Sequence, residues 1–211
     1  MGPVTTIILS CDHPQVPHIR FVQLGPETLA ALIAGDLPAA SAAAGIPLTP
    51  YLLSETWLWR IRLDQIHADP GSADWIARAA VAEPEGVVVG HGGFHGPPDA
   101  DGTVEVAYSV DPAHRRHGYA KAMLAALLER ADADPAVRAV RASIRPDNAA
   151  SLATVAGFGF TKIGEQWDPE DGLEDVYLRP SPPGGPGRPD PPGGRGRPCP
   201  SGAPNSTTSG R

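Results

Sequence analysis

Basic residues and a glycine stand together between an extended segment and an alanine-rich segment of this 211-residue chain. Residues 115–120 read Arg-Arg-His-Gly-Tyr-Ala, and Lys121 follows them. The first amides of a helix have no partner inside it, and the helix dipole places partial positive charge there. Gly118 has no Cβ, so the backbone can approach a ligand closely at that position. These residues therefore predict a turn that binds a diphosphate.

Two common nucleotide-binding patterns do not fit this turn. A P-loop requires G-x-x-x-x-G-K-[ST], whereas Ala122 follows Lys121. The dinucleotide fingerprint G-x-G-x-x-G is also missing. What remains is R-x-x-G-x-A placed directly after a strand pattern.

This remaining pattern resembles motif A of the GNAT acetyltransferases, which has the form [QR]-x-x-G-x-[GA]. Two further segments match that family in the correct order. Residues 148–151 (Asn-Ala-Ala-Ser) with the Gly-Phe pair at 159–160 resemble its N-x-x-[AS]…G-F segment. Residues 104–108 (Val-Glu-Val-Ala-Tyr) resemble the E-[IV]-[GA]-Y strand of the RimJ/RimL-like branch. The resemblance extends over residues 18–179.

The resemblance implies an α+β protein of the GNAT fold. Its single mixed, mostly antiparallel central sheet would have flanking helices and be splayed at the acetyl-CoA site, between strands at 103–110 and 137–144. Val110 would pair with the pantetheine amide and polarise the thioester carbonyl, Asn148 would meet the pantetheine arm, and Ser151 would lie near the coenzyme. The expected pyrophosphate ligands are Arg115, Arg116, His117, Gly118, Tyr119, Ala120 and Lys121.

Hydrophobic periodicity and turn residues independently predict an α+β order of elements. Ser54 is a good N-cap for a helix in which Trp57, Leu58 and Ile61 recur at helical spacing, so we expect Trp57 in the core. The expected strands span residues 18–23, 75–82, 87–94, 103–110, 137–144, 158–167 and 174–178, and the expected helices 26–33, 37–44, 54–67, 117–131 and 148–156.

A base is needed because an amine nucleophile must lose a proton. Glu105 is the candidate, on the opposite face of its strand from Val104 and Val106; a paired or solvated strand carboxylate is the alternative. For the general acid, many family members place a tyrosine where this chain has Val155. Ser151 or water would instead protonate the leaving thiolate, or the thiolate would leave without a proton donor. The alternative for Ser151 is a hydroxyl that only caps the helix or lies on its surface.

Metal binding is not expected. His91 and His95 are four residues apart on a predicted strand and share a face, but no third ligand accompanies them. The two cysteines lie at opposite ends of the sequence without metal-ligand spacing, which favours a reducing, cytoplasmic setting. We also expect no membrane span and, from the formal net charge of −7, no nucleic-acid partner.

We expect an N-terminal extension at 1–17, an acetyltransferase domain at 18–180 and a tail at 181–211. The composition changes after Arg179, and residues 180–211 contain ten Pro and eight Gly, which is typical of disorder. The predicted activity is transfer of acetyl from acetyl-CoA to a primary amine, directly in a ternary complex. The acceptor would be a small molecule or a protein N-terminus, and the protein a monomer or homodimer. The alternatives are an inactive acyl-CoA-binding regulatory module and an interaction protein acting through its tail.

Overall fold

The computed structural model describes residues 17–169 and 172–182. Their seven strands form one sheet of order β1-β2-β3-β4-β5-β7-β6, antiparallel throughout except for the parallel pair β4–β5. The strands are β1 (His18–Gln23), β2 (Arg78–Glu83), β3 (Val87–Phe94), β4 (Thr103–Val110), β5 (Ala139–Ile144), β6 (Thr161–Asp168) and β7 (Gly172–Pro180). The predicted α+β fold with a mixed, mostly antiparallel sheet is confirmed.

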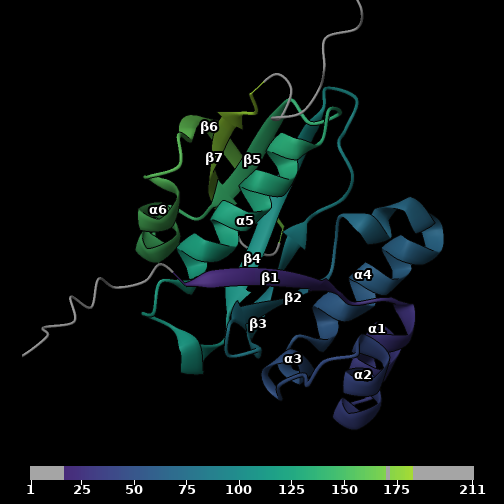
Figure 1. Ribbon diagram of the computed structural model, residues 1–211. Coiled ribbons are helices and arrows are strands. Elements are labelled where there is room, and N and C mark those ends of the chain that lie inside the picture. Colours follow the sequence, from purple (N-terminus) through teal and green to yellow (C-terminus); the bar gives the residue numbers. More distant parts are fainter. Residues whose placement is uncertain (1–16, 170–171, 183–211) are drawn as a thin grey trace, which may run out of the picture.

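The helices gather in two places (Figure 1). One group lies beside the N-terminal strands, whereas α5 lies along β4 and contacts α6. The α-helices are α1 (Pro26–Ile33), α2 (Leu37–Ala44), α3 (Tyr51–Ser54), α4 (Thr56–Ala68), α5 (Tyr119–Ala133) and α6 (Ala149–Val155). No helix of the described residues is long and apolar enough to cross a membrane. The expected extension up to residue 16 and the tail from residue 183 lie outside these residues.

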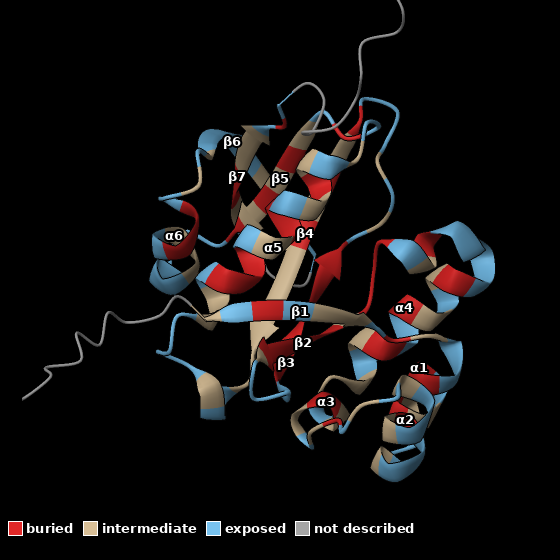
Figure 2. Ribbon diagram, viewed as in Figure 1, coloured by how far each residue is buried: buried red, intermediate tan, exposed pale blue. Residues whose placement is uncertain are grey.

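The core is continuous through the middle strands, where β2 and β3 are buried over most of their length (Figure 2). Gly90 shows how closely β3 and β4 approach: a Cβ there would lie 2.1 Å from the Ser109 carbonyl oxygen. A smaller cluster between β1–β3 and α5 includes Ile19, Val89 and Met123. This packing fixes α5, and therefore its N-terminus, against the sheet.

The prediction for the helix at 54–67, that Ser54 caps it and that it buries Trp57 in the core, is wrong. The helix breaks at Glu55, so Ser54 ends α3 instead of capping α4. Trp57 is 55% exposed and Trp59 fully buried. The physical reason is that the Trp59 indole N–H donates to the Leu52 carbonyl oxygen at 2.5 Å, which satisfies both groups inside the core.

Candidate active site

Strands β4 and β5 are paired only at their starts. The parallel register runs from Thr103 opposite Ala139 to Glu105 opposite Arg141, and no pairs continue beyond it. The later part of β4 keeps its pairing with β3 as far as Val110, opposite Gly90. One side of β4 is therefore without a strand partner from residue 106 onward, which is the splay that the sequence resemblance implies.

A cavity of about 390 Å³ lies at this splay. Residues from both faces of β4 line it, and α6 and strands β5, β6 and β7 complete the wall. Chemically, the wall combines carboxylates, hydroxyls and an amide with a few apolar groups. The polar lining residues used below are His95, Glu105, Tyr108, Ser143, Ser151, Gln166, Asp168 and Glu174.

The carboxylate of Glu105 is mostly covered, with a side chain 21% exposed. Its Oε1 accepts a hydrogen bond of 2.5 Å from the Ser143 hydroxyl. Its Oε2 lies 3.7 Å from Arg141 Nε and 4.0 Å from His95 Nδ1. Within the cavity, Glu105 is thus a fixed carboxylate with one oxygen bonded and the other near two nitrogens. This arrangement suits a proton acceptor.

The α6 helix places Ser151 in the cavity wall and Asn148 outside it. The Asn148 side chain caps the helix, because its Oδ1 accepts from the Ser151 backbone N–H at 3.0 Å. Val155, at the position where many family members have a tyrosine, also lines the cavity. Tyr108 lines the same space, and burial raises the pKa of its phenol to about 12. Tyr108 therefore stays protonated at neutral pH.

The basic turn is exposed and ends in the N-terminus of α5. Gly118 has a φ of +84° and Arg116 a φ of +68°, both in the left-handed region. Within the described chain no side chain caps α5, so its first amides have no side-chain acceptor. Arg115 instead donates from Nε to the Val110 carbonyl oxygen at 3.3 Å, which ties the turn to the end of β4. Uncapped amides beside two arginines suit a diphosphate.

The backbone of β4 links the turn to the cavity. The Asp111 N–H donates to the Val89 carbonyl oxygen on β3 at 2.9 Å. Successive N–H groups of a strand point to opposite sides, so the Val110 N–H points away from β3 toward the splay. That amide is available to a ligand lying between β4 and β5. The remaining expected ligands, His117, Tyr119, Ala120 and Lys121, lie at the turn or in the first turn of α5.

His91 lies in β3 and His95 just after its end, and the two side chains have different neighbours. His95 is near Glu105, whereas His91 is buried, stacked on Tyr51 and edge-on to Trp59. Burial, and secondarily the charge of Arg62, lowers the pKa of His91 to about 4. Among residues 17–169 and 172–182, no group of three or more His, Cys, Asp or Glu could hold a metal ion.

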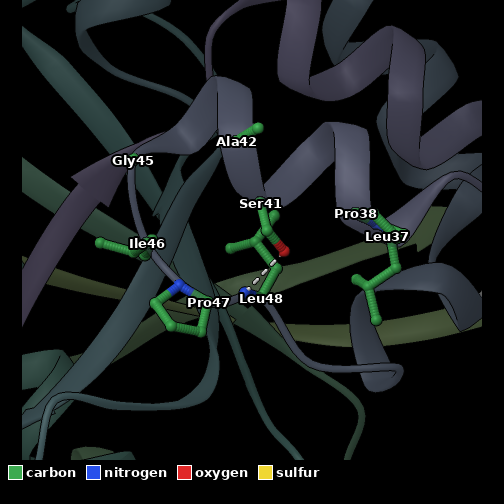
Figure 3. A pocket seen from close by; sticks show the side chains of 8 residues that line it. All are labelled: Leu37, Pro38, Ser41, Ala42, Gly45, Ile46, Pro47 and Leu48. Atoms are coloured by element: carbon green, nitrogen blue, oxygen red, sulfur yellow. Dashed lines mark hydrogen bonds between the residues drawn. The ribbon is translucent and has the colours of Figure 1, made fainter.

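A larger hollow of about 570 Å³ lies elsewhere, around the end of α2 (Figure 3). Its lining is apolar apart from the Ser41 hydroxyl, which accepts from the Leu48 N–H at 3.0 Å. No titratable side chain faces it within the described part of the chain. This hollow is open and has no acid, base or charged group among the described residues that line it, so the smaller cavity is the candidate site.

Sequence reasoning missed the part of the site on β5, β6 and β7. Ser143 and Arg141 lie next to Glu105, and Gln166 joins Ser143 to Glu174, but none of these residues matches a motif. One signal was present: in β5, Arg141 and Ser143 alternate with buried residues, so this strand shows a polar face. Tyr108 belonged to a recognised segment, but its place in the cavity depends on the splay.

The fold thus has the architecture that the resemblance implies. The model of the acetyltransferase (GNAT) domain matches residues 21–161, which is more than half of the chain. The chain therefore belongs to the GNAT acetyltransferase family. It is also 30% identical over 124 residues to a mycothiol acetyltransferase of Stackebrandtia nassauensis. That match covers 59% of this chain and only 38% of the relative.

Solved structures share the fold. RimJ of Mycobacterium smegmatis, in complex with CoA-disulfide, aligns with a TM-score of 0.53 at 19% identity, covering 78% of this chain and 86% of that one. A variant of the spermidine N-acetyltransferase SpeG from Vibrio cholerae aligns with a TM-score of 0.54 at 12% identity, covering 78% and 94%. At these identities the likeness concerns the fold alone.

Proposed function

We propose that this protein transfers an acetyl group from acetyl-CoA to a primary amine. The observation that carries the proposal is the arrangement along β4: Glu105 lies covered where the sheet separates, and the strand ends in an exposed basic turn that leads into the uncapped start of α5. The GNAT family membership supports acetyl-CoA as the donor. Acetyl-CoA supplies an activated thioester. Residues of this chain would bind the donor, accept the proton of the amine and stabilise the charge that develops.

The residues at the turn fit the diphosphate of coenzyme A. The uncapped amides that begin α5 supply donors, Gly118 leaves the approach open, and Arg115 and Arg116 supply positive charge. The Val110 N–H, directed into the splay, suits an amide or carbonyl oxygen of the donor. Asn148 uses its side-chain oxygen to cap α6, so only its amide nitrogen remains for the pantetheine arm.

In the proposed mechanism Glu105 accepts the proton that the attacking amine must lose, directly or through a water molecule. The Val110 N–H stabilises negative charge on the carbonyl oxygen. Ser151, in the same wall, is the proposed donor to the leaving sulfur. In this proposal the amine attacks the bound thioester directly, in a ternary complex.

The acceptor is proposed to be cationic. Glu105, Asp168 and Glu174 all line the cavity, and carboxylates favour an ammonium group over a neutral or acidic substrate. The structural neighbour SpeG is a spermidine N-acetyltransferase, which fits this class of acceptor. A protein N-terminus remains the other acceptor that this chemistry permits.

The test is a thiol-release assay with acetyl-CoA and a panel of polyamines, aminoglycosides and N-terminal peptides. Turnover with cationic amines, and none with carboxylic acids or alcohols, would support the proposal. If acetyl-CoA binds but no acceptor in the panel causes release of thiol, the protein is instead an inactive acyl-CoA-binding regulatory module.

A further inference from the structure

The Glu105 carboxylate is held by a chain of hydrogen bonds from neighbouring strands. The Ser143 hydroxyl on β5 donates to Glu105 Oε1 at 2.5 Å. On β6, Gln166 Nε2 donates to Ser143 Oγ at 3.1 Å and to Glu174 Oε2 at 2.9 Å. Arg141 donates to Gln166 Oε1. The chain therefore runs from Arg141 through Gln166 and Ser143 to Glu105.

The direction of this chain is fixed by its ends. A guanidinium can only donate, so the oxygen of the Gln166 amide must face Arg141. An ionised carboxylate can only accept, so the nitrogen of that amide must face Glu174. Ser143 lies on the nitrogen side and therefore accepts from Gln166. Its single hydroxyl hydrogen is then left for Glu105.

The two oxygens of Glu105 are consequently not equivalent. Oε1 is occupied by the Ser143 hydroxyl at 2.5 Å. Oε2 has Arg141 Nε at 3.7 Å and His95 Nδ1 at 4.0 Å, both beyond hydrogen-bonding distance. Oε2 is thus the oxygen that can accept a proton from a group in the cavity.

We infer that Ser143 is a positioning residue that orients Glu105, with Gln166 fixing the direction of its hydroxyl. The inference rests on the proposed function and adds to it the group that aims the base. When the amine nitrogen bonds the acyl carbon and the carbon–sulfur bond breaks, the amine proton goes to Oε2 and the sulfur gains a proton from a donor in the wall or from water. Ser143 keeps its own proton and transfers none.

The first test separates turnover from binding. Ser143→Ala should lower kcat about tenfold while the KM for acetyl-CoA changes less than about twofold, because misdirecting the base affects the chemical step. Ser143→Thr keeps a hydroxyl and should recover most of kcat. Ser41→Ala is the matched control, a part-buried serine hydroxyl hydrogen-bonded far from the site, and should leave kcat unchanged. No loss in Ser143→Ala, or no recovery in Ser143→Thr, would overturn the inference.

The second test asks whether Ser143 acts through Glu105. In a Glu105→Gln background, Ser143→Ala should lower kcat by less than about twofold further, since the base is already gone. A full additional tenfold loss would show that Ser143 acts independently of Glu105 and would refute the positioning role.

A third test needs no substrate, so it also applies if no amine is acetylated and the proposed function fails. Thermal unfolding of the full-length chain is compared for Ser143→Ala, Glu105→Gln and the double variant. If the hydrogen bond joins the two side chains, the losses in stability will not be additive. Additive losses would refute the chain of hydrogen bonds, whereas non-additive losses without turnover would refute only the activity.

Discussion

The turn proposed to bind the diphosphate and the carboxylate cavity are built in opposite ways. The turn is made of contiguous residues, 115–121, and its properties are local: two left-handed backbone positions and an uncapped helix start. The cavity takes its polar groups from strands β4 to β7, from α6 and from His95 just after β3, which are far apart in the sequence. A local site can be recognised from a short pattern, whereas a site assembled across a sheet depends on register. This is why the proposed donor is better defined than the acceptor.

The largest expected effect tests the cavity. Glu105→Gln should lower kcat about 10²- to 10⁴-fold, the usual contribution of a general base, and change the KM for acetyl-CoA little. Steady-state kinetics with the best acceptor measures both quantities. Glu129→Gln, an exposed carboxylate on α5, is the control and should behave as wild type. An unchanged kcat in Glu105→Gln would show that Glu105 is not the general base.

The next effect concerns the buried side of β3, next to the strand that carries the cavity. In the folded protein the pKa of His91 is lowered to about 4, whereas in the unfolded chain it is about 6.5. The folded state therefore binds a proton less readily than the unfolded state. The unfolded state therefore takes up a proton between these values, and stability falls as the pH drops through that window. Below it, the loss would approach about 3 kcal/mol.

Chemical unfolding at pH 7, 5.5 and 4 measures this loss. His91→Phe keeps an aromatic ring beside Tyr51 and Trp59 but cannot titrate. The variant should therefore lose distinctly less stability than wild type over the same interval. Equal losses in the two proteins would mean that His91 is not the group responsible.

A smaller effect is expected at the turn. Gly118→Val should weaken acetyl-CoA binding about tenfold with little change in kcat, because a β-branched residue at a φ of +84° costs about 1–2 kcal/mol and displaces the first amides of α5. The site has room, since the new Cβ would lie 3.5 Å from Pro17. Calorimetric titration measures the affinity. Gly157→Val, at a position with nothing within 4 Å, is the control. A loss of kcat with unchanged affinity for acetyl-CoA would contradict the proposal that this turn binds the diphosphate.

The smallest effect separates function from stability within the same turn. Arg116→Gly should relieve the strain of a non-glycine residue at a φ of +68° and, after the added entropy of the unfolded chain, stabilise the fold by up to about 1 kcal/mol. Loss of one exposed charge should weaken acetyl-CoA binding by about fivefold or less. Thermal unfolding and titration together check this. A variant that is both less stable and equally tight in binding would show that Arg116 has no part in the anion site.

Much of the fold was predictable because its signals are local. Strands β1, β3 and β4 and helices α1 and α2 have the expected bounds, since alternating apolar residues and flanking Gly or Pro mark them. The face of α4 was not predictable. The break at Glu55 and the bond from Trp59 to Leu52 depend on contacts with α3, which periodicity does not record.

The sequence by itself determined the family and most of the order of the elements, and it predicted the turn for a diphosphate, because each rests on residues close together in the chain. It also identified Glu105 as a candidate base from its segment. Only the tertiary structure decided what surrounds that carboxylate. The reason is that β4 and β5 separate after Glu105, and β6 and β7 then bring Gln166 and Glu174 to the gap.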